Sequence, residues 1–224
     1  MPAPIKIVGG QKSQIPGVEL STDQLWGAIY ETVKPLDYTG NGQVLGHYRI
    51  AKQFANTAAQ TGPLFTYRWA PNGNQLMVPL RISASAVITT PFTTAQVVDI
   101  MATIARAYTA AATGGTALAP FTTGQKDRTN MGSSLISDMR YGNITAGTRT
   151  LDAAPFSTAI ISSGNSALAG VLPQIDLYSL PNQMSHPIVH SANEGMEISP
   201  ATALGAAGIL TYYIVLEWAE VVVF

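Results

Sequence analysis

The clearest strand pattern in the chain is a period of two in the side chains from Gln75 to Thr90. A period of two is typical of a β-strand with one face on a hydrophobic core and the other on solvent or a neighbour. The predicted apolar face comprises Leu76, Val78, Leu80, Ile82, Ala84, Ala86 and Ile88, and the opposite face carries Gln75, Arg81, Ser83, Ser85 and Thr89. Pro79 cannot donate a hydrogen bond within a sheet, so we expect a sheet edge or a β-bulge there.

A second alternating run extends from Ile209 to Trp218. Its apolar face collects Leu210, Tyr212, Ile214, Leu216 and Trp218, and the opposite face carries Ile209, Thr211, Tyr213, Val215 and Glu217. Burying such a face stabilises the fold by roughly 1.5–3 kcal/mol per large side chain. We therefore predict a central strand.

Shorter strands are predicted elsewhere. Residues 64–69, LFTYRW, are rich in aromatic and β-branched residues, and the turn after them contains Asn72-Gly73, a strong hairpin signal. Other strands, separated by Gly, Asn and Pro turns, are predicted over 134–145, 155–163, 174–180, 186–190 and 195–199. The first of these alternates Leu135, Ser137, Met139 and Tyr141 against Ile136, Asp138 and Arg140. Strands at these spacings are typical of a β-sandwich.

Two segments fit either a helix or a strand. For residues 93–115, a capping box formed by Thr93 and Gln96 and a stop at Gly114-Gly115 favour a helix with its stripe at Val97, Met101, Ile104, Ala105 and Tyr108. A strand would instead align Val98, Ile100, Ala102 and Ile104 on one face. The flanking segments are predicted to be strands, which favours a strand that spans residues 96–108. Residues 21–38 are compatible with both elements.

Residues 1–20 are predicted to form an extended N-terminal arm. Three prolines and several glycines prevent a continuous helix, and the few apolar residues cannot form a core of their own. Such an arm becomes ordered when it pairs with another chain, and residues 5–8 can add a strand to a neighbouring subunit. The chain is thus predicted to be all-β, with this arm followed by a single antiparallel β-sandwich domain over 21–224.

The charge content of the chain excludes some classes of function. The 12 basic and 13 acidic side chains amount to 11% of the residues and leave a net charge of -1, against a typical charged share of roughly 25%. This balance excludes an electrostatic nucleic-acid binder, which needs a basic patch or arm. The uncharged run 198–216 is interrupted by Pro200 and alternates like a strand, so we predict no membrane span. Low charge suits a chain that covers much of its surface with partners.

The sequence offers few residues for catalysis or metal binding. It has no cysteine, which excludes disulfides, thiolate nucleophiles and cysteine metal sites. The histidines are His47, His186 and His190, and Glu194 could join the last two as a ligand. In the strand predicted for HPIVH, however, positions four apart lie about 13 Å from each other. We therefore predict structural or interface histidines and no metal.

No enzymatic motif is complete. Neither GSSL at Gly132 nor SSGNS at Ser162 matches the strained nucleophile turn of a hydrolase. The carboxylate pairs Glu194/Glu197 and Glu217/Glu220 have the residue types of a glycosidase, but their spacing does not predict a shared cleft. TGG at Thr113 is a turn, and the chain has no phosphate-binding or dinucleotide-binding loop. We assign no catalytic residue and no cofactor, and predict that the protein is not an enzyme.

One aromatic cluster suggests a binding function. Phe65, Tyr67 and Trp69, next to Arg68, could stack on a sugar ring. A core strand with one arginine reaching solvent is the commoner explanation of this pattern. The three aromatic rings alternate with their neighbours and share one face, so the side of the sheet on which they lie distinguishes the two interpretations.

Several segments together resemble an uncharacterised group of tailed-bacteriophage virion structural proteins. The similarity extends from about residue 44 to residue 221 and depends on the order of individually weak motifs, namely GHYRIAKQF, GPLFTYRWA, ATGGTAL, KDRTNMGSSLISDMRYGNITAGTRTLDAAPF, HPIVHSANEGMEIS and LEWAEV. The resemblance implies a jelly-roll-like β-sandwich and a capsid decoration, or cement, role. It carries no catalytic residue over, and the N-terminal arm has no counterpart.

The sequence therefore predicts a virion protein, assembled in the host cytoplasm, that binds and stabilises the head surface. Its expected partners are the major capsid protein or another virion protein and further copies of itself, with a homotrimer favoured because symmetric oligomers fill symmetric capsid sites. The alternative is a carbohydrate-binding β-sandwich used for host adsorption. A self-assembling shell protein of a small virus is less favoured, because only Lys6 and Lys12 lie in the first twenty residues.

Overall fold

The computed structural model describes residues 44–57, 62–71, 73–118, 125–127, 132–164, 173–180, 187–205 and 207–222. The predicted arm and the undecided segment 21–38 lie outside the described residues. The strands are β1 (Val44–Thr57), β2 (Phe65–Trp69), β3 (Leu76–Thr90), β4 (Gln96–Arg106), β5 (Thr113–Ala117), β6 (Ile136–Thr145), β7 (Thr150–Leu151), β8 (Ser157–Gly164), β9 (Ile175–Ser179), β10 (Glu194–Pro200) and β11 (Ile209–Val221).

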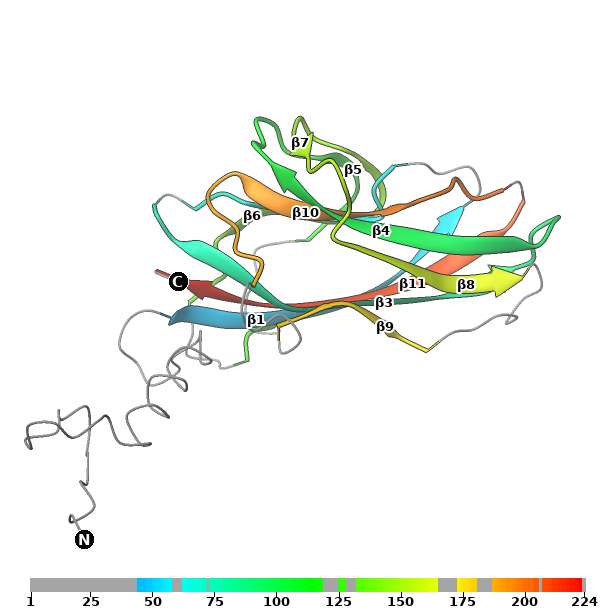
Figure 1. The fold of residues 1–224 in the computed structure, drawn as a ribbon, viewed down its shortest axis with the longest axis horizontal. Helices are drawn as coiled ribbons and strands as arrows, with labels where there is room; N and C mark the ends of the chain where they lie inside the picture. The colour runs from blue at the N-terminus through cyan, green and yellow to red at the C-terminus, as the bar shows by residue number, and fades with distance from the viewer. Residues whose placement is uncertain are drawn as a thin grey trace, which may run out of the picture.

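These strands form two antiparallel sheets that face each other (Figure 1). The four-stranded sheet has the order β1-β11-β3-β9, and the larger sheet has the order β5-β6-β2-β10-β4-β7, with β8 also paired to β4. The predicted all-β sandwich is confirmed. β11 lies between β1 and β3, as predicted for a central strand.

The pairing of eight strands defines a jelly roll. Taken in chain order without β5, β6 and β7, the first strand pairs with the eighth (β1 with β11) and the second with the seventh (β2 with β10). The third pairs with the sixth (β3 with β9) and the fourth with the fifth (β4 with β8). This nested antiparallel pairing, rolled into two sheets, is the jelly-roll arrangement. The jelly-roll-like fold implied by the family resemblance is therefore present.

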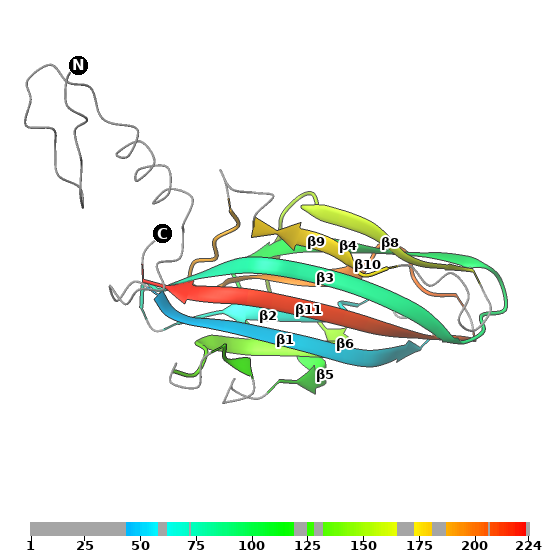
Figure 2. The ribbon, with the colours of Figure 1, turned by 90° about the horizontal axis from the view of Figure 1, so that it is seen from below.

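The segment between β4 and β8 enlarges one sheet. It carries β5 and β6, which extend the larger sheet beyond β2, before β7 returns the chain to β4. Figure 2 shows the result: β8 and β9 lie along one long side of the sandwich, and β5 and β6 lie along the opposite side. The two sides of the molecule therefore differ.

The core between the sheets is rich in aromatic rings. The ring of Trp218 stacks on Tyr48 with centroids 5.5 Å apart, and Tyr212 stacks on Phe54 at 5.6 Å. All five residues of the predicted apolar face of β11 are buried there. The larger sheet contributes a second aromatic group from β2, which comprises Phe65, Tyr67 and Trp69. The interior is thus filled with side chains from both sheets.

Residues 96–106 form strand β4, which is the alternative that the predicted strands on either side favoured. Val98, Ile100 and Ala102 face the core and are buried. Val97, which the helical alternative placed in a buried stripe, is 60% exposed. The predicted strand face is therefore confirmed for these residues.

The predicted apolar face of β3 is wrong in its first half. The register between β3 and β11 shifts next to Pro79, where a bulge was expected. Beyond this bulge Ile82, Ala84, Ala86 and Ile88 face the main core as predicted. Before it the two faces exchange, so Met77 enters the main core while Leu76, Val78 and Leu80 lie on the outer face with Ala219 and Val221. One extra residue reverses every side chain on one side of it.

The predicted faces of β6 are also wrong, because a second bulge shifts the register of this strand. Its pairing with β2 skips Ser137, because Asp138 lies opposite Arg68 and Ile136 opposite Trp69. Ile136 therefore packs against the core, and Leu135, predicted on the apolar face, is 39% exposed.

The hairpin predicted at Asn72-Gly73 is also wrong. The strands before and after it, β2 and β3, belong to different sheets. Trp69 Nε1 instead donates a hydrogen bond to the carbonyl of Gln75, which holds the two ends of the connection together at 3.0 Å. Turn residues permit a tight reversal, but the pairing partner of each strand depends on the rest of the fold.

Candidate functional site

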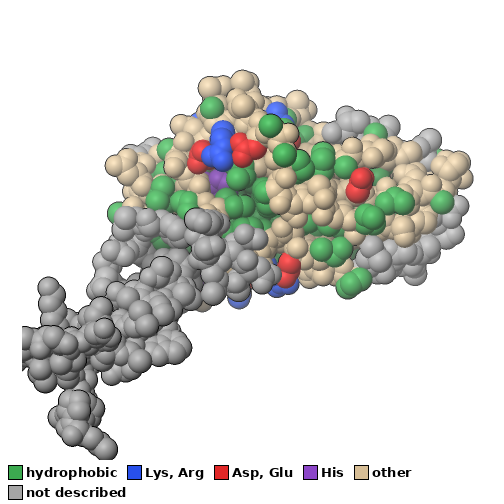
Figure 3. All heavy atoms as spheres, in the orientation of Figure 1, with side chains coloured by type: hydrophobic (Ala, Val, Ile, Leu, Met, Phe, Trp, Pro, Cys, Tyr) green, Lys and Arg blue, Asp and Glu red, His purple; other side chains and the backbone are tan. Residues whose placement is uncertain are grey.

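A group of charged side chains lies at one end of the larger sheet. Arg106, the last residue of β4, contacts Asp152 through Nε at 2.7 Å and Glu194, the first residue of β10, through Nη1 at 2.7 Å. Glu194 also accepts a hydrogen bond from the backbone of Ser191 at 2.8 Å. In Figure 3 basic and acidic side chains gather at this end of the sandwich, directly above histidine atoms. These ion pairs tie together three chain segments.

A buried histidine lies close to this charged group. His190 is 1% exposed, and its Nε2 forms a 2.8 Å hydrogen bond with the hydroxyl of Tyr67. Its backbone pairs in both directions with Met77, which fixes the segment to β3. Burial, with a smaller effect of Arg106, lowers the pKa of His190 to about 3. The ring is therefore held in its neutral form at physiological pH.

The two carboxylates of β10, Glu194 and Glu197, do not share a cleft. Glu194 binds Arg106, whereas Glu197 is 4% exposed and binds Arg149 through Nε at 2.9 Å and Nη2 at 2.5 Å. Ser199 donates a further hydrogen bond to Glu197 at 3.2 Å. Both carboxylates have an arginine partner, as structural ion pairs do.

The second carboxylate pair is also separated. Glu217 lies on the outer face of β11, opposite Arg81. Glu220 is fully buried, and it accepts hydrogen bonds from Ser134 Oγ, from the Leu135 backbone at 3.1 Å and from Trp218 Nε1 at 3.1 Å. Burial raises the pKa of Glu220. Ser134, part of the GSSL stretch, therefore anchors a loop to the end of the last strand.

The histidines are not brought together among the described residues. His47 Nδ1 contacts the carboxylate of Asp127, which also lies 3.5 Å from Arg49. His186 lies outside the described residues. In the part of the chain that the structure describes, no three His, Asp or Glu side chains are grouped as metal ligands.

The aromatic cluster of β2 lies inside the sandwich. Phe65, Tyr67 and Trp69 share one face, as predicted, and each is at most 1% exposed. Arg68 points to the other side, where its Nη2 donates to Asn193 at 2.6 Å. These rings therefore provide no platform for a sugar.

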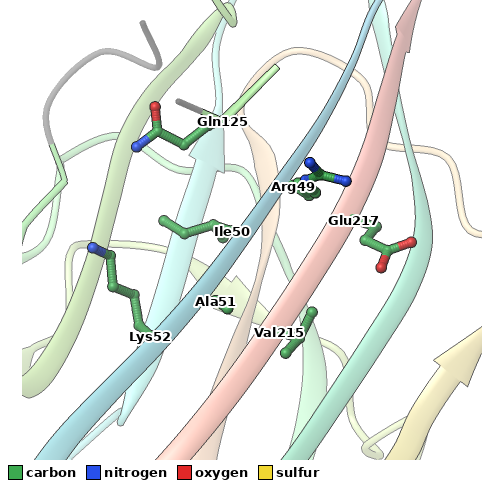
Figure 4. Close-up of a pocket in the computed structure, with 7 residues that line it drawn as sticks. All are labelled: Arg49, Ile50, Ala51, Lys52, Gln125, Val215 and Glu217. Atoms are coloured by element: carbon green, nitrogen blue, oxygen red, sulfur yellow. The ribbon is translucent and has the colours of Figure 1, made fainter. Parts of the chain in front are cut away.

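A shallow groove of about 290 Å³ follows the edge of β1 (Figure 4). It is lined by Arg49, Ile50, Ala51, Lys52, Gln125, Val215 and Glu217. Arg49 lies near Asp127, and the ammonium of Lys52 lies 5.8 Å from the centroid of the Tyr141 ring. The charges in the groove are of both signs and have neighbours within the chain, so the groove does not select one ligand chemistry.

Among the described residues, the two large apolar side chains with the highest exposed fractions lie on β4 and β8. Val97 is 60% exposed and Ile160 is 51% exposed, and both point away from the core. Their strands are adjacent, with Val97 opposite Ser163 and Asp99 opposite Ile160. This surface, defined by Val97 and Ile160, is the best candidate for contact with another protein. The sequence pattern failed to identify it because both residues also fit a buried strand.

Within the described residues, no helix has the length and apolar character needed to cross a membrane. No protein-family model matches the sequence, and no curated protein is significantly similar to it. A functional conclusion therefore depends on the fold, on the surfaces described above and on the resemblance of the sequence motifs.

Proposed function

We propose that this protein is a structural subunit of a tailed-bacteriophage virion, namely a decoration protein that binds and stabilises the outer surface of the head. The observation that carries the proposal is the jelly-roll pairing of β1 to β11, since this fold is common among viral capsid domains. Lectin domains and cupins also have this fold. The fold alone therefore does not separate a decoration protein from a carbohydrate-binding protein, and the side chains in the core and on the surface must be compared.

The surface supports a structural role. Exposed positions of the four-stranded sheet carry mostly small or neutral side chains, which include Ala51, Gln53, Ala55, Thr89 and Thr90. None of these side chains needs an ion-pair partner, and the alanines lose no side-chain conformational entropy on contact. Many weak contacts of this kind become strong when a symmetric oligomer makes them together. The proposed partners are the major capsid protein and other copies of this chain, with a trimer favoured.

The carbohydrate-binding alternative was based on the aromatic cluster of β2, and this cluster is buried. Phe65, Tyr67 and Trp69 fill the core, where Tyr67 also holds His190. A sugar would have to displace these packed rings to reach them. We therefore favour the decoration role.

Quantitative mass spectrometry of purified virions that contain this chain tests the proposal. We expect hundreds of copies per particle, and a reconstruction of the particle should place them on the outside of the head. A dozen copies or fewer, density confined to the tail, or absence from the particle would refute the decoration role.

The N-terminal arm provides a further prediction. Deleting residues 1–18 should leave the circular-dichroism spectrum of the domain unchanged, because the described strands begin at Val44. Incorporation into particles should fall, because the arm is predicted to pair with another chain. Particle pull-down of the truncated and full chains measures the difference, and equal incorporation of both would show that the arm is dispensable.

A further inference from the structure

The outer face of the four-stranded sheet has a buried apolar patch at one end. Val78 of β3 and Ala219 of β11 are fully buried, and Val221 is 1% exposed. These three residues form the outer patch. Their chain neighbours Met77 and Trp218 face the main core, so the patch lies on the opposite side of the sheet. The outer face of a two-layer sandwich normally meets water, and full burial there requires a further layer of protein.

The described apolar residues around the outer patch belong to the sheet itself. Leu76 and Leu80 flank Val78 along β3. Val189 lies beside β3, because the backbone of the next residue, His190, pairs with that strand. Side chains on one face of a sheet stand next to one another and leave their tips uncovered. These residues therefore do not supply the covering layer.

The segment just before β1 has the sequence of an amphipathic helix. Its apolar stripe, with a spacing of four, consists of Leu25, Ile29 and Val33. Ser21 can cap the start of the helix, and Pro35 ends it. A strand over the same residues would need a backbone partner, which the face of a sheet does not offer. A helix pairs its own backbone groups and can lie on such a face.

The chain enters β1 beside the outer patch. Val44, the first residue of β1, lies opposite Val221, and in Figure 2 the start of β1 lies next to the end of β11. Residues 39–43 join the segment to β1 and can span about 17 Å. β11 and β3 lie about 5 and 10 Å from β1, which is within this reach. Residues 181–186 and 223–224 also adjoin this end, but each offers at most two large apolar side chains.

We propose that residues 21–34 form a helix that packs its apolar stripe on the outer patch of the same chain. A helix of this length extends about 21 Å and can cross β1, β11 and β3. The opposite end of the sheet, with Ala55 and Thr89, stays available for partners. This covering does not depend on the virion role, and it leaves residues 1–20 available for the predicted contact with another chain.

Thiol labelling of the full-length protein tests the covering. The chain has no cysteine, so Val78→Cys introduces a single thiol at the outer patch. We expect Ellman's reagent to label this thiol slowly. The further change Ile29→Asp should accelerate labelling at least tenfold, because a carboxylate in the apolar stripe prevents packing. Rapid labelling of Val78→Cys alone, or a rate that Ile29→Asp leaves unchanged, would refute the proposal.

Met77→Cys is the matched control, since Met77 precedes Val78 in β3 and faces the main core. Its thiol should be labelled equally slowly with and without Ile29→Asp. Equal acceleration at both positions would mean that the segment does not act at the outer patch, and it would overturn the proposal. Protection of the Val78→Cys thiol that increases with protein concentration would assign the covering to another copy, which also contradicts the proposal.

Gly27→Ala distinguishes a helix from a strand in the same assay. Gly27 lies on the side of the proposed helix opposite the apolar stripe. Alanine stabilises a helix relative to glycine, so labelling of the Val78→Cys thiol should slow about fourfold. An unchanged or faster rate would show that the segment does not cover the outer patch as a helix.

Discussion

Replacing Arg149 with alanine is expected to lower the free energy of unfolding by about 3–5 kcal/mol. The substitution leaves the carboxylate of Glu197, 4% exposed, without the guanidinium that it binds at 2.5 and 2.9 Å. A buried unpaired charge is costly because it has lost its hydration and gains nothing in return. Urea denaturation at pH 7 measures the loss.

Arg106→Ala is the matched control for this prediction. Arg106 binds two carboxylates, but its side chain is 47% exposed, so water replaces its contacts and the expected cost is below about 1 kcal/mol. Changing Arg149 to Met and Glu197 to Leu together should recover most of the lost stability, since no charge then remains buried. A loss below about 1 kcal/mol for Arg149→Ala would show that Glu197 is solvated after the change.

The second large effect is a loss of stability in acid that depends on His190. Its pKa is about 3 in the folded protein and about 6.5 in the unfolded chain. The unfolded chain therefore binds a proton that the folded protein excludes between these values. The histidine contributes its full stability above pH 6.5 and loses it as the pH falls toward 3, on the order of 3 kcal/mol between pH 7 and pH 4.

His190→Gln separates this effect from other titrating groups. Glutamine does not titrate, and it retains a hydrogen-bonding group for Tyr67. Other groups, including Glu220, whose raised pKa acts in the opposite direction, are present in both proteins and cancel in the comparison. Urea unfolding at pH 7, 5.5 and 4 should show a steeper decline for the wild type. Parallel declines in the two proteins would exclude His190 as the source.

The sequence pattern was sufficient for strands with one clear apolar face. The alternation from Leu210 to Trp218 predicted a central strand correctly, because every second residue is large and apolar and the intervening side chains are mixed. The sequence did not show in the same way which side chains of β3 face the core before Pro79. Pro79 indicated an irregularity, but Met77 and Val78 are both apolar, so the pattern did not show which one faces the core.

The polar contacts were harder to predict because they join distant parts of the chain. Tyr67 and His190 meet only because β2 pairs with β10 and the residues just before β10 bridge to β3. Arg149 reaches Glu197 from the segment between β6 and β7. Neither pair has a local spacing that would identify it. By contrast, the shared face of Phe65, Tyr67 and Trp69 followed from alternation alone, and only the side on which it packs required the structure.

The nested pairing of the jelly roll also determines when the protein can fold during synthesis. β1 is the first described strand, yet its pairing partner β11 comes after all the other described strands. Until β11 has emerged from the ribosome, β1 and β3 have no strand between them and the inner faces of the four-stranded sheet stay uncovered. Such distant pairing slows folding and prolongs exposure to aggregation. The growing chain is therefore expected to complete its native pairing only after β11 has left the ribosome.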